Sequence, residues 1–336
     1  MTASPATQTA TRVANRATKK VPTIKAIQQP VQEELATFQK YFKGSVKSDI
    51  SLLDKVLRYL IRQKGKRIRP LLVLLSAKIC GEVTDKSYRG AALVELMHTA
   101  TLIHDDVVDD ADRRRGMFSI NALWKNKVAI LLGDFLLSRG LLLALDHKDY
   151  ESLHILSDAV KRMSEGELLQ IQKARLLDID ESTYFSIISD KTASLIAACT
   201  ACGASSVTDD ETIVSQMKIM GEKLGVAFQI RDDLFDYGIK DVGKPLGIDL
   251  QEKKMTLPLI YALKQASGDD HKRIMRIVRK KKKSKQDIRE VAEFVTAQGG
   301  IAYAKNKMNA HADEARAILL DFPDSPAREA MLDLID

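Results

Sequence analysis

The sequence contains few of the residues that break helices. Its 336 residues include only 8 prolines and 17 glycines, and aromatic residues make up 5%. Apolar residues nevertheless make up 45%, with leucine, isoleucine, alanine and methionine dominant. Long helices can therefore form without interruption, and this composition favours packed helices over sheets.

Cysteine is also scarce. The three cysteines are Cys80, Cys199 and Cys202, and an odd count in a chain of this length indicates a reducing compartment. Cys199 and Cys202 have the Cys-x-x-Cys spacing of redox and zinc sites, but no second pair accompanies them. Small apolar residues surround both, so we expect buried helix residues rather than a redox or zinc site.

The sequence lacks both a long apolar run and a secretory signal. No run of about 20 uncharged apolar residues occurs, so we expect no transmembrane segment. The first 30 residues have no apolar core, but they contain five basic residues and no acid. We expect residues 1–28 to be a disordered basic tail, although their composition also fits an organellar transit peptide. The expected location is cytoplasmic, or organellar if these residues are a transit peptide.

The distribution of charge argues against a nucleic-acid partner. The net charge is +7, and five of the basic residues lie in the first 30 residues, which leaves the remainder close to neutral. A basic run at residues 279–283 has no interleaved aromatic residue that could stack on bases. We interpret this run as a solvated loop between two helices rather than a patch for nucleic acid or anionic lipid.

Helical periodicity is nearly continuous from about residue 31 onward. The predicted helices are 51–63, 70–79, 87–110, 129–145, 150–177, 183–202, 210–237, 257–267, 285–298 and 301–322. No convincing strand, Gly-x-Gly-x-x-Gly turn or Walker loop is present. We therefore expect an all-α protein in which residues 29–336 form one large helical bundle around a central cavity, with both acidic motifs described below facing it.

One acidic motif appears twice in an apolar helical context. It reads Asp-Asp-x-x-Asp, at Asp105, Asp106 and Asp109, and again at Asp232, Asp233 and Asp236. The first and last carboxylates of such a motif lie one turn apart on a helix, and they repel one another unless a cation lies between them. Carboxylate oxygens suit magnesium, which also recruits phosphate oxygens from a substrate. A single acidic triplet is usually a solvated helix face, but the repeat and the basic residues after each copy favour a metal–diphosphate site.

Several further motifs accompany the acidic pair. In chain order they are Gly65-Lys-Arg-Ile-Arg-Pro70, Arg114-Arg115-Gly116, Lys191-Thr192, Phe228-Gln229, Gly243-Lys244 and Lys254-Met-Thr-Leu-Pro258. Together with the two acidic motifs, this ordered set resembles the trans-isoprenyl diphosphate synthases, also called polyprenyl synthetases. The resemblance runs from about Val31 to the C-terminus. One departure is Lys253, where the family usually has glycine before the lysine.

The resemblance implies a reaction and its partners. An allylic diphosphate such as farnesyl or geranyl diphosphate loses diphosphate, the double bond of isopentenyl diphosphate attacks the allylic cation, and a proton is then removed. The family also implies Mg²⁺, with three ions per site, and a homodimer. Two other functions stay open: a non-catalytic subunit of a heteromeric synthase, which typically loses acidic motifs, and a terpene cyclase, which binds no isopentenyl diphosphate.

The resemblance also assigns roles to residues. The six aspartates are the implied metal ligands, and Asp105, Asp106, Asp109, Lys191, Thr192 and Asp232 are the implied catalytic residues. The implied ligands of the allylic diphosphate are Arg114, Lys191, Gln229, Lys244 and Lys254. Those of isopentenyl diphosphate are Lys66, Arg69, His98 and Arg115. Outside this set, His98 would be a satisfied core histidine, and Lys66 and Arg69 would be surface charges.

Product length is predicted from the residues before the first aspartate. Short-chain members of the family place bulky aromatics four and five residues before it, where this sequence has Thr101 and Ala100. Neither side chain would block a channel for the growing prenyl tail, and Met97, one turn further down, is flexible. We therefore expect a product longer than fifteen carbons, suited to the side chain of a respiratory quinone.

Overall fold

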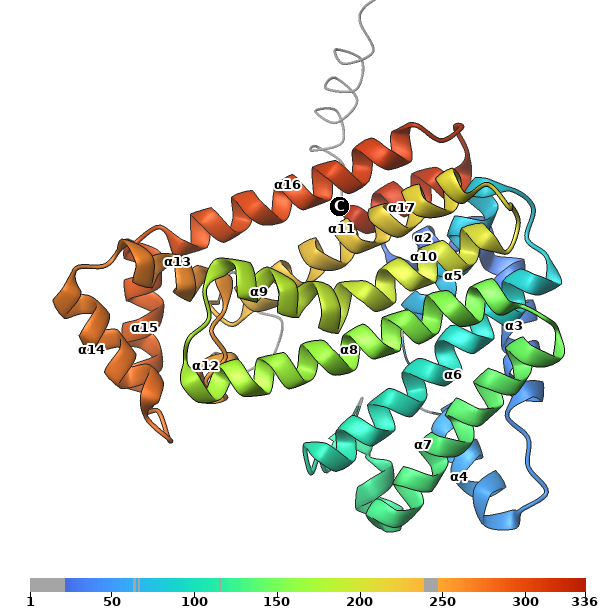
Figure 1. Cartoon of the computed structure of the whole chain (residues 1–336), viewed down its shortest axis with the longest axis horizontal. Helices are drawn as coiled ribbons and strands as arrows, with labels where there is room; N and C mark the ends of the chain where they lie inside the picture. Colours follow the sequence, from blue (N-terminus) through green and yellow to red (C-terminus); the bar gives the residue numbers. More distant parts are fainter. Residues whose placement is uncertain (1–21, 63–64, 66, 115, 239–246) are drawn as a thin grey trace, which may run out of the picture. The chain divides into compact units, whose positions relative to one another are not determined.

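The computed structural model describes residues 22–62, 65, 67–114, 116–238 and 247–336, and nearly all of them lie in helices (Figure 1). The all-α expectation is confirmed. The helices form two units, which are described separately. Unit 1 comprises Met1–Asp158, Ala197–Ile219 and Ala317–Asp336, and unit 2 comprises Ala159–Ile196 and Met220–Arg316.

Each unit has its own set of helices. Unit 1 contains α2 (Ile24–Gln28), the 3₁₀ turn η1 (Gln29–Val31), α3 (Gln32–Ser45), α4 (Ser51–Arg62), α5 (Ile68–Cys80), α6 (Asp85–Val108), α7 (Ile120–Asp146) and α17 (Pro326–Ile335). Unit 2 contains α9 (Glu181–Ile188), the π-helical segment η2 (Ser189–Ala193), α12 (Ile248–Gln251), α13 (Leu257–Gln265), α14 (Gly268–Arg279) and α15 (Lys285–Ala297). Four helices contribute residues to both units: α8 (Tyr150–Leu176), α10 (Ser194–Ser205), α11 (Glu211–Phe235) and α16 (Gly300–Leu320).

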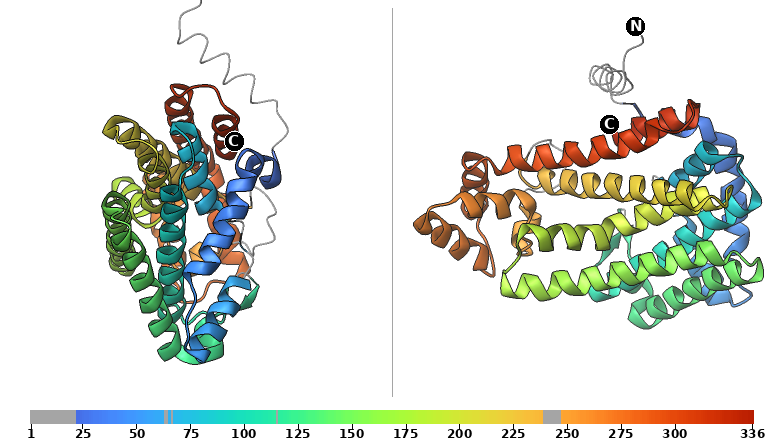
Figure 2. Two further views of the ribbon diagram at one scale, coloured as in Figure 1. Left: turned by 90° about the vertical axis from the view of Figure 1, so that its right-hand side faces the viewer. Right: turned by 45° about the horizontal axis from the view of Figure 1, so that its top comes forward.

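Helix α6 is the central helix of unit 1. It begins after Thr84, whose side chain forms a capping box with Ser87, and it lies alongside α7 (Figure 1). Ala100 and Ile103 of α6 belong to a buried apolar cluster that also includes Leu132 of α7. The helix leaves this core at its C-terminal end, where the first acidic motif is found. Unit 2 has a larger apolar cluster built mainly from α11 and α13–α15, and α13–α15 gather at one end of that unit (orange and brown in Figures 1 and 2).

The structure differs from the predicted elements in several places. Two short strands, β1 (Arg113–Arg114) and β2 (Met117–Phe118), pair antiparallel although no strand was expected. A two-residue strand is too short to show an alternating pattern. The predicted helix 183–202 is interrupted by the π-helical segment η2. Residues 24–28, expected in the disordered tail, form α2, and α3, α12, α14 and α17 were not among the predicted helices.

Helix α7 is more apolar than the sequence analysis expected. Among the described residues, it is the one helix whose length and hydropathy would allow it to cross a membrane, with a mean hydropathy of 2.0 in its most apolar window. Core helices of soluble proteins pass the same test, so this result is weak support for a membrane span. Only 33% of that window is buried, and Leu131 and Leu142 are 60% and 48% exposed. The helix therefore presents an apolar face that the single chain does not cover.

Candidate active site

Both acidic motifs lie at the C-terminal ends of helices. In unit 1, α6 ends at Val108, and the amide of Asp109 donates to the carbonyl of Asp105 (2.8 Å). In unit 2, α11 ends at Phe235, between the second and third aspartates of its motif. The C-terminus of a helix carries partial negative charge, so carboxylates placed there are destabilising and a cation is favoured. The prediction that both motifs face one cavity is not tested and stays a prediction.

Asp106 and Arg114 form an ion pair at the first motif. The side chain of Asp106 is 5% exposed, and its Oδ1 accepts from Arg114 Nε (2.8 Å) and Nη2. The strand pair β1–β2 places Arg114 there, because Gly116 adopts a φ of +78° that closes the turn. Asn121 donates to the Asp106 carbonyl (3.1 Å). Asp105 and Asp109, in contrast, are exposed.

A cavity of about 870 Å³, open to solvent, adjoins this ion pair in unit 1. Phe38, Phe42 and Ile103 contribute to its apolar wall, and Asp106 and Arg114 lie at its polar part. An apolar wall beside a guanidinium group is suited to a small apolar molecule that carries an anionic group.

The predicted isopentenyl-diphosphate and product-length residues that the structure describes lie on α5 and α6. His98 is 5% exposed on α6, and Arg69 is partly buried in the first turn of α5. Ala100 and Met97 are buried in packed core, whereas Thr101 is partly exposed and its hydroxyl donates to the His98 carbonyl (2.9 Å). None of these five residues lines the cavity of unit 1. The predicted residues Lys66, Arg115 and Lys244 lie outside the described residues.

In unit 2, Lys191 and Thr192 lie on the π-helical segment η2. Lys191 Nζ contacts Glu167 Oε2 (2.5 Å) and donates to Gln170 Oε1 (3.2 Å). Thr192 Oγ1 donates to Gln229 Oε1 (2.9 Å). A π-helical turn inserts one extra residue and reorients the side chains that follow, which is why such turns are frequent at functional sites.

Helices α8 and α11 both contact this π-helical segment, each through a charged side chain and a closely packed glycine. On α8, Arg162 donates to Asp190 (2.8 Å) and Ser189 (3.0 Å), and Gly166 lies so close that a Cβ there would be 2.9 Å from the amide nitrogen of Lys191. On α11, Glu222 accepts from Ser189 (2.5 Å) and from Arg162 (2.9 Å).

Gly225 completes the α11 side. A Cβ at this position would lie 2.5 Å from the Cα of Ala193. Each helix thus presents a charged residue, a glycine and a glutamine to the segment, in chain order Arg162, Gly166 and Gln170 on α8, and Glu222, Gly225 and Gln229 on α11. The segment that carries Lys191 and Thr192 is therefore fixed by packing as well as by hydrogen bonds.

Two carboxylates of the second acidic motif, Asp233 and Asp236, have raised pKa values. Asp233 accepts from Gln229 (2.9 Å) and from the Tyr184 hydroxyl (2.7 Å). The pKa of Asp233 is raised to about 7, chiefly by burial; the two hydrogen bonds oppose this rise, and the charges of Asp249 and Asp232 add to it. Burial and the charge of Asp249 also raise the pKa of Asp236. Crowded carboxylates with raised pKa values form a site that a cation would stabilise.

A second cavity of about 830 Å³ collects these groups. Its wall includes Lys191, Thr192, Gln229, Asp232, Asp233, Asp249 and Lys254. Lys254 Nζ lies 2.6 Å from Glu252 and 3.5 Å from Asp249. The cavity therefore combines carboxylates with two ammonium groups, as a site for a metal-bound diphosphate requires.

The donor chemistry fits a hard divalent cation. All six candidate ligands are carboxylates, but within the described residues no group of three or more histidine, cysteine or acidic side chains is placed to hold a metal ion. Magnesium does not need one, because it keeps several waters and takes further oxygens from substrate phosphates. Sequence reasoning missed Asp249 and Tyr184. An acid five residues before Lys254 could have indicated Asp249, whereas Tyr184 meets Asp233 only through the fold.

Comparisons with known proteins identify the family. Residues 50–295 match the polyprenyl synthetase family. The octaprenyl diphosphate synthase of Escherichia coli is 33% identical over 315 residues, which cover 93% of this chain and 97% of that protein. A decaprenyl diphosphate synthase from Rhodobacter capsulatus superposes with a TM-score of 0.87 at 34% identity, covering 94% of this chain and 98% of that one. For a polyprenyl synthase from Caulobacter crescentus, crystallised with calcium and isoprenyl diphosphate, the TM-score is 0.84 at 32% identity, with coverages of 94% and 97%. The order of the motifs, the helical fold and these similarities agree, and the chain belongs to the polyprenyl synthetase family.

Proposed function

We propose that this prenyltransferase condenses isopentenyl diphosphate with an allylic diphosphate, such as farnesyl or geranyl diphosphate, to make a polyprenyl diphosphate longer than C15. The observation that carries the proposal is the second cavity, where acidic residues of the Asp232 motif meet Lys191 and Lys254. The names of the long-chain relatives support the same activity. Use of the product as a quinone side chain is part of the proposal, and the location of the protein stays a prediction.

The proposed roles follow from the chemistry of each group. The bond between C1 and oxygen of the allylic diphosphate breaks, and the leaving diphosphate takes both electrons. Bound Mg²⁺, proposed as three ions on the two Asp motifs, would supply electrostatic stabilisation of that leaving group. Lys191, Lys254, Arg114 and Gln229 bind its oxygens, and the oxygen of Thr192 steadies the allylic cation. The new carbon–carbon bond takes its electrons from the isopentenyl double bond, and the lost proton goes to the diphosphate.

A homodimer is the second part of the proposal. The uncovered face of α7 includes Leu131, Leu142 and Leu145, which are 60%, 48% and 47% exposed. Exposed apolar faces of this kind are typical of protein interfaces. A second copy of the chain would cover this face and remove the apolar side chains from water.

The test is incubation with isopentenyl and farnesyl diphosphates, with magnesium or with EDTA, followed by mass analysis of the extracted prenyl chains. A magnesium-dependent ladder that ends at one long product is expected. Conversion of farnesyl diphosphate alone to a hydrocarbon would instead identify a terpene cyclase. Folded protein without turnover would favour the non-catalytic subunit.

A further inference from the structure

The helical hairpin α14–α15 carries a segregated positive charge. Residues 268–297 contain ten basic and five acidic residues, a net charge of +5. Outside this hairpin and the first 30 residues, the chain has 37 basic and 40 acidic residues. The hairpin is therefore a basic element on a body that is slightly acidic, which is the pattern of an electrostatic contact surface.

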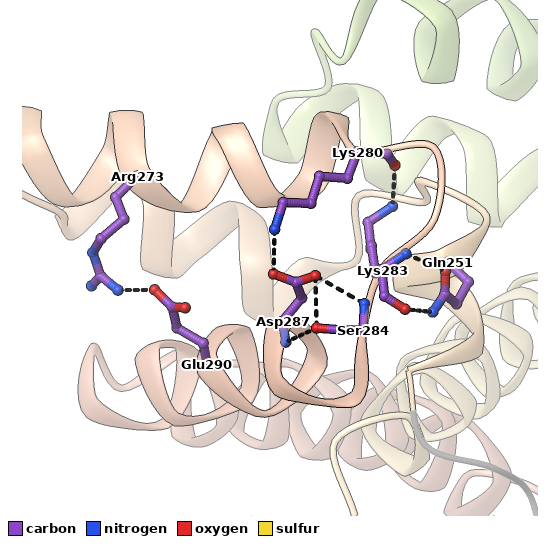
Figure 3. A network of polar contacts seen from close by, with 7 residues as sticks. All are labelled: Gln251, Arg273, Lys280, Lys283, Ser284, Asp287 and Glu290. Atoms are coloured by element: carbon purple, nitrogen blue, oxygen red, sulfur yellow. Dashed lines mark hydrogen bonds and ion pairs between the residues drawn. The ribbon is translucent and has the colours of Figure 1, made fainter.

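The turn of the hairpin is held in place by polar contacts (Figure 3). Asp287 accepts from Lys280 Nζ (2.6 Å) and from the amide and hydroxyl of Ser284 (2.8 and 2.9 Å), which closes a capping box at the start of α15. The ammonium group of Lys283 folds inward onto the Lys280 carbonyl (3.0 Å) and is buried. Gln251 of α12 binds the main chain of Lys283 at both its carbonyl (2.8 Å) and its amide (3.2 Å). The turn is thus fixed to α12, the element that carries Asp249.

The remaining basic side chains of the hairpin are exposed. Within the described residues, no ion pair is formed by the following seven: Lys272, Arg276, Arg279, Lys281, Lys282, Lys285 and Arg289. On α14, Lys272, Arg276 and Arg279 recur at the spacing of one helix face, opposite the buried Ile274 and Val278. Lys281 and Lys282 lie at the turn between the two helices. No large apolar side chain of the hairpin is exposed, so this surface can bind only through charge.

The basic run at residues 279–283 was predicted to be a solvated loop between two helices. It begins at the last residue of α14 and leads into the turn before α15, as predicted, but Lys283 is buried rather than solvated. The rigid turn and the unpaired cations now support a further role. We infer that the α14–α15 hairpin docks the enzyme on an anionic lipid surface through its exposed lysines and arginines. We assign anionic phospholipid headgroups as the partner of this surface because of the product proposed above. That product joins a diphosphate to a long apolar tail that is insoluble in water and would enter a membrane. No phenylalanine, tyrosine or tryptophan side chain of the hairpin is available to stack on bases, since Phe294 is buried.

Vesicle binding by the full-length protein tests the inference without substrate, so its result is independent of the proposed reaction. Cosedimentation with vesicles of phosphatidylcholine alone is compared with vesicles that contain phosphatidylglycerol, at low and high salt. Wild-type protein should bind only the anionic vesicles and should be released by salt, because exposed charges are screened. Each basic residue near such a surface contributes roughly fivefold in affinity, so K281E/K282E should bind at least about thirtyfold more weakly.

The matched control is K55E/K305E, which makes the same change in net charge at exposed lysines of α4 and α16. It should keep most of the vesicle affinity. Equal binding by K281E/K282E and wild type would overturn the inference and place the binding elsewhere, for example in the basic N-terminal residues. Equal losses in both double variants would overturn it as well, since only net charge would matter. Binding to single-stranded RNA but not to vesicles would identify a nucleic-acid surface instead.

Discussion

Substitution of Gly225 by alanine tests whether close packing positions the π-helical segment. A Cβ at Gly225 would lie 2.5 Å from Ala193 Cα and 2.7 Å from its Cβ. Non-bonded carbon atoms pack at about 3.5–4.0 Å, so α11 and the segment must separate by about 1 Å. Overpacking of this kind costs about 1–3 kcal/mol, whereas the change from glycine to alanine inside a helix gains about 1 kcal/mol.

Gly44→Ala is the matched control. Gly44 lies in α3, and a Cβ there would meet no atom within 4 Å. Gly44 is the penultimate residue of α3, where alanine gains at most as much helix propensity as at Gly225. The difference between the two free energies of unfolding is therefore a lower limit on the overpacking cost. We expect Gly225→Ala to be less stable than Gly44→Ala by about 1–3 kcal/mol in chemical denaturation.

Activity should separate the two variants further. A shift of about 1 Å would break the 2.9 Å hydrogen bond between Thr192 and Gln229, and misplacement of this size costs about 100-fold in rate. We expect kcat/KM to fall by that factor in Gly225→Ala and to stay at the wild-type value in Gly44→Ala. If both variants are equally stable and equally active, the glycine does not position the segment.

Three further results are expected. Leu131→Glu should convert a dimer into monomers in light-scattering measurements, because it places a charge in an apolar interface; an unchanged mass would assign the dimer contact to another surface. Ala100→Phe and Thr101→Phe should each shorten the longest product in mass analysis. Ala100 is fully buried and its substitution also costs about 1–3 kcal/mol, so an unchanged product from Thr101→Phe decides against the predicted channel. In metal-free protein, the pKa of Asp233 is about 7 against its ordinary value of 3.8. The protonated carboxyl therefore contributes up to about 4 kcal/mol to the free energy of unfolding below about pH 4, and this contribution is lost as pH rises through 7. Asp233→Asn should flatten this pH dependence of unfolding, and an unchanged slope would assign it to other groups.

The sequence predicted what depends on local pattern. Apolar periodicity predicted the helices α4–α8, α11, α13, α15 and α16, since this signal arises from neighbours in the chain. It did not predict α2, α3, α12, α14 or α17. The π-helical segment at Ser189–Ala193 was missed, because contacts from α8 and α11 stabilise it and its own residues do not encode it. Tyr184 was missed for the same reason: its partner Asp233 lies 49 residues away. The ion pair between Arg114 and Asp106 likewise depends on the short strand pair β1–β2. Two-residue strands are too short to be predicted from an alternating apolar pattern.

The ion pairs of the candidate site show how it accommodates charge before substrate binds. Lys191 pairs with Glu167, and both side chains are at least 35% exposed. Lys254 pairs with Glu252 and also with Asp249, whose side chain is only 23% exposed. An exposed pair such as Lys191–Glu167 contributes roughly 0.2–1 kcal/mol, so under the proposed function a diphosphate would take over Lys191 at little cost. The pair between Arg114 and Asp106 differs, since Asp106 is 5% exposed, and removal of its partner would leave a buried carboxylate uncompensated. Under the proposed function, Arg114 would turn to a diphosphate only if another cation replaced it at Asp106, which would link metal binding to substrate binding at the first motif but not at Lys191.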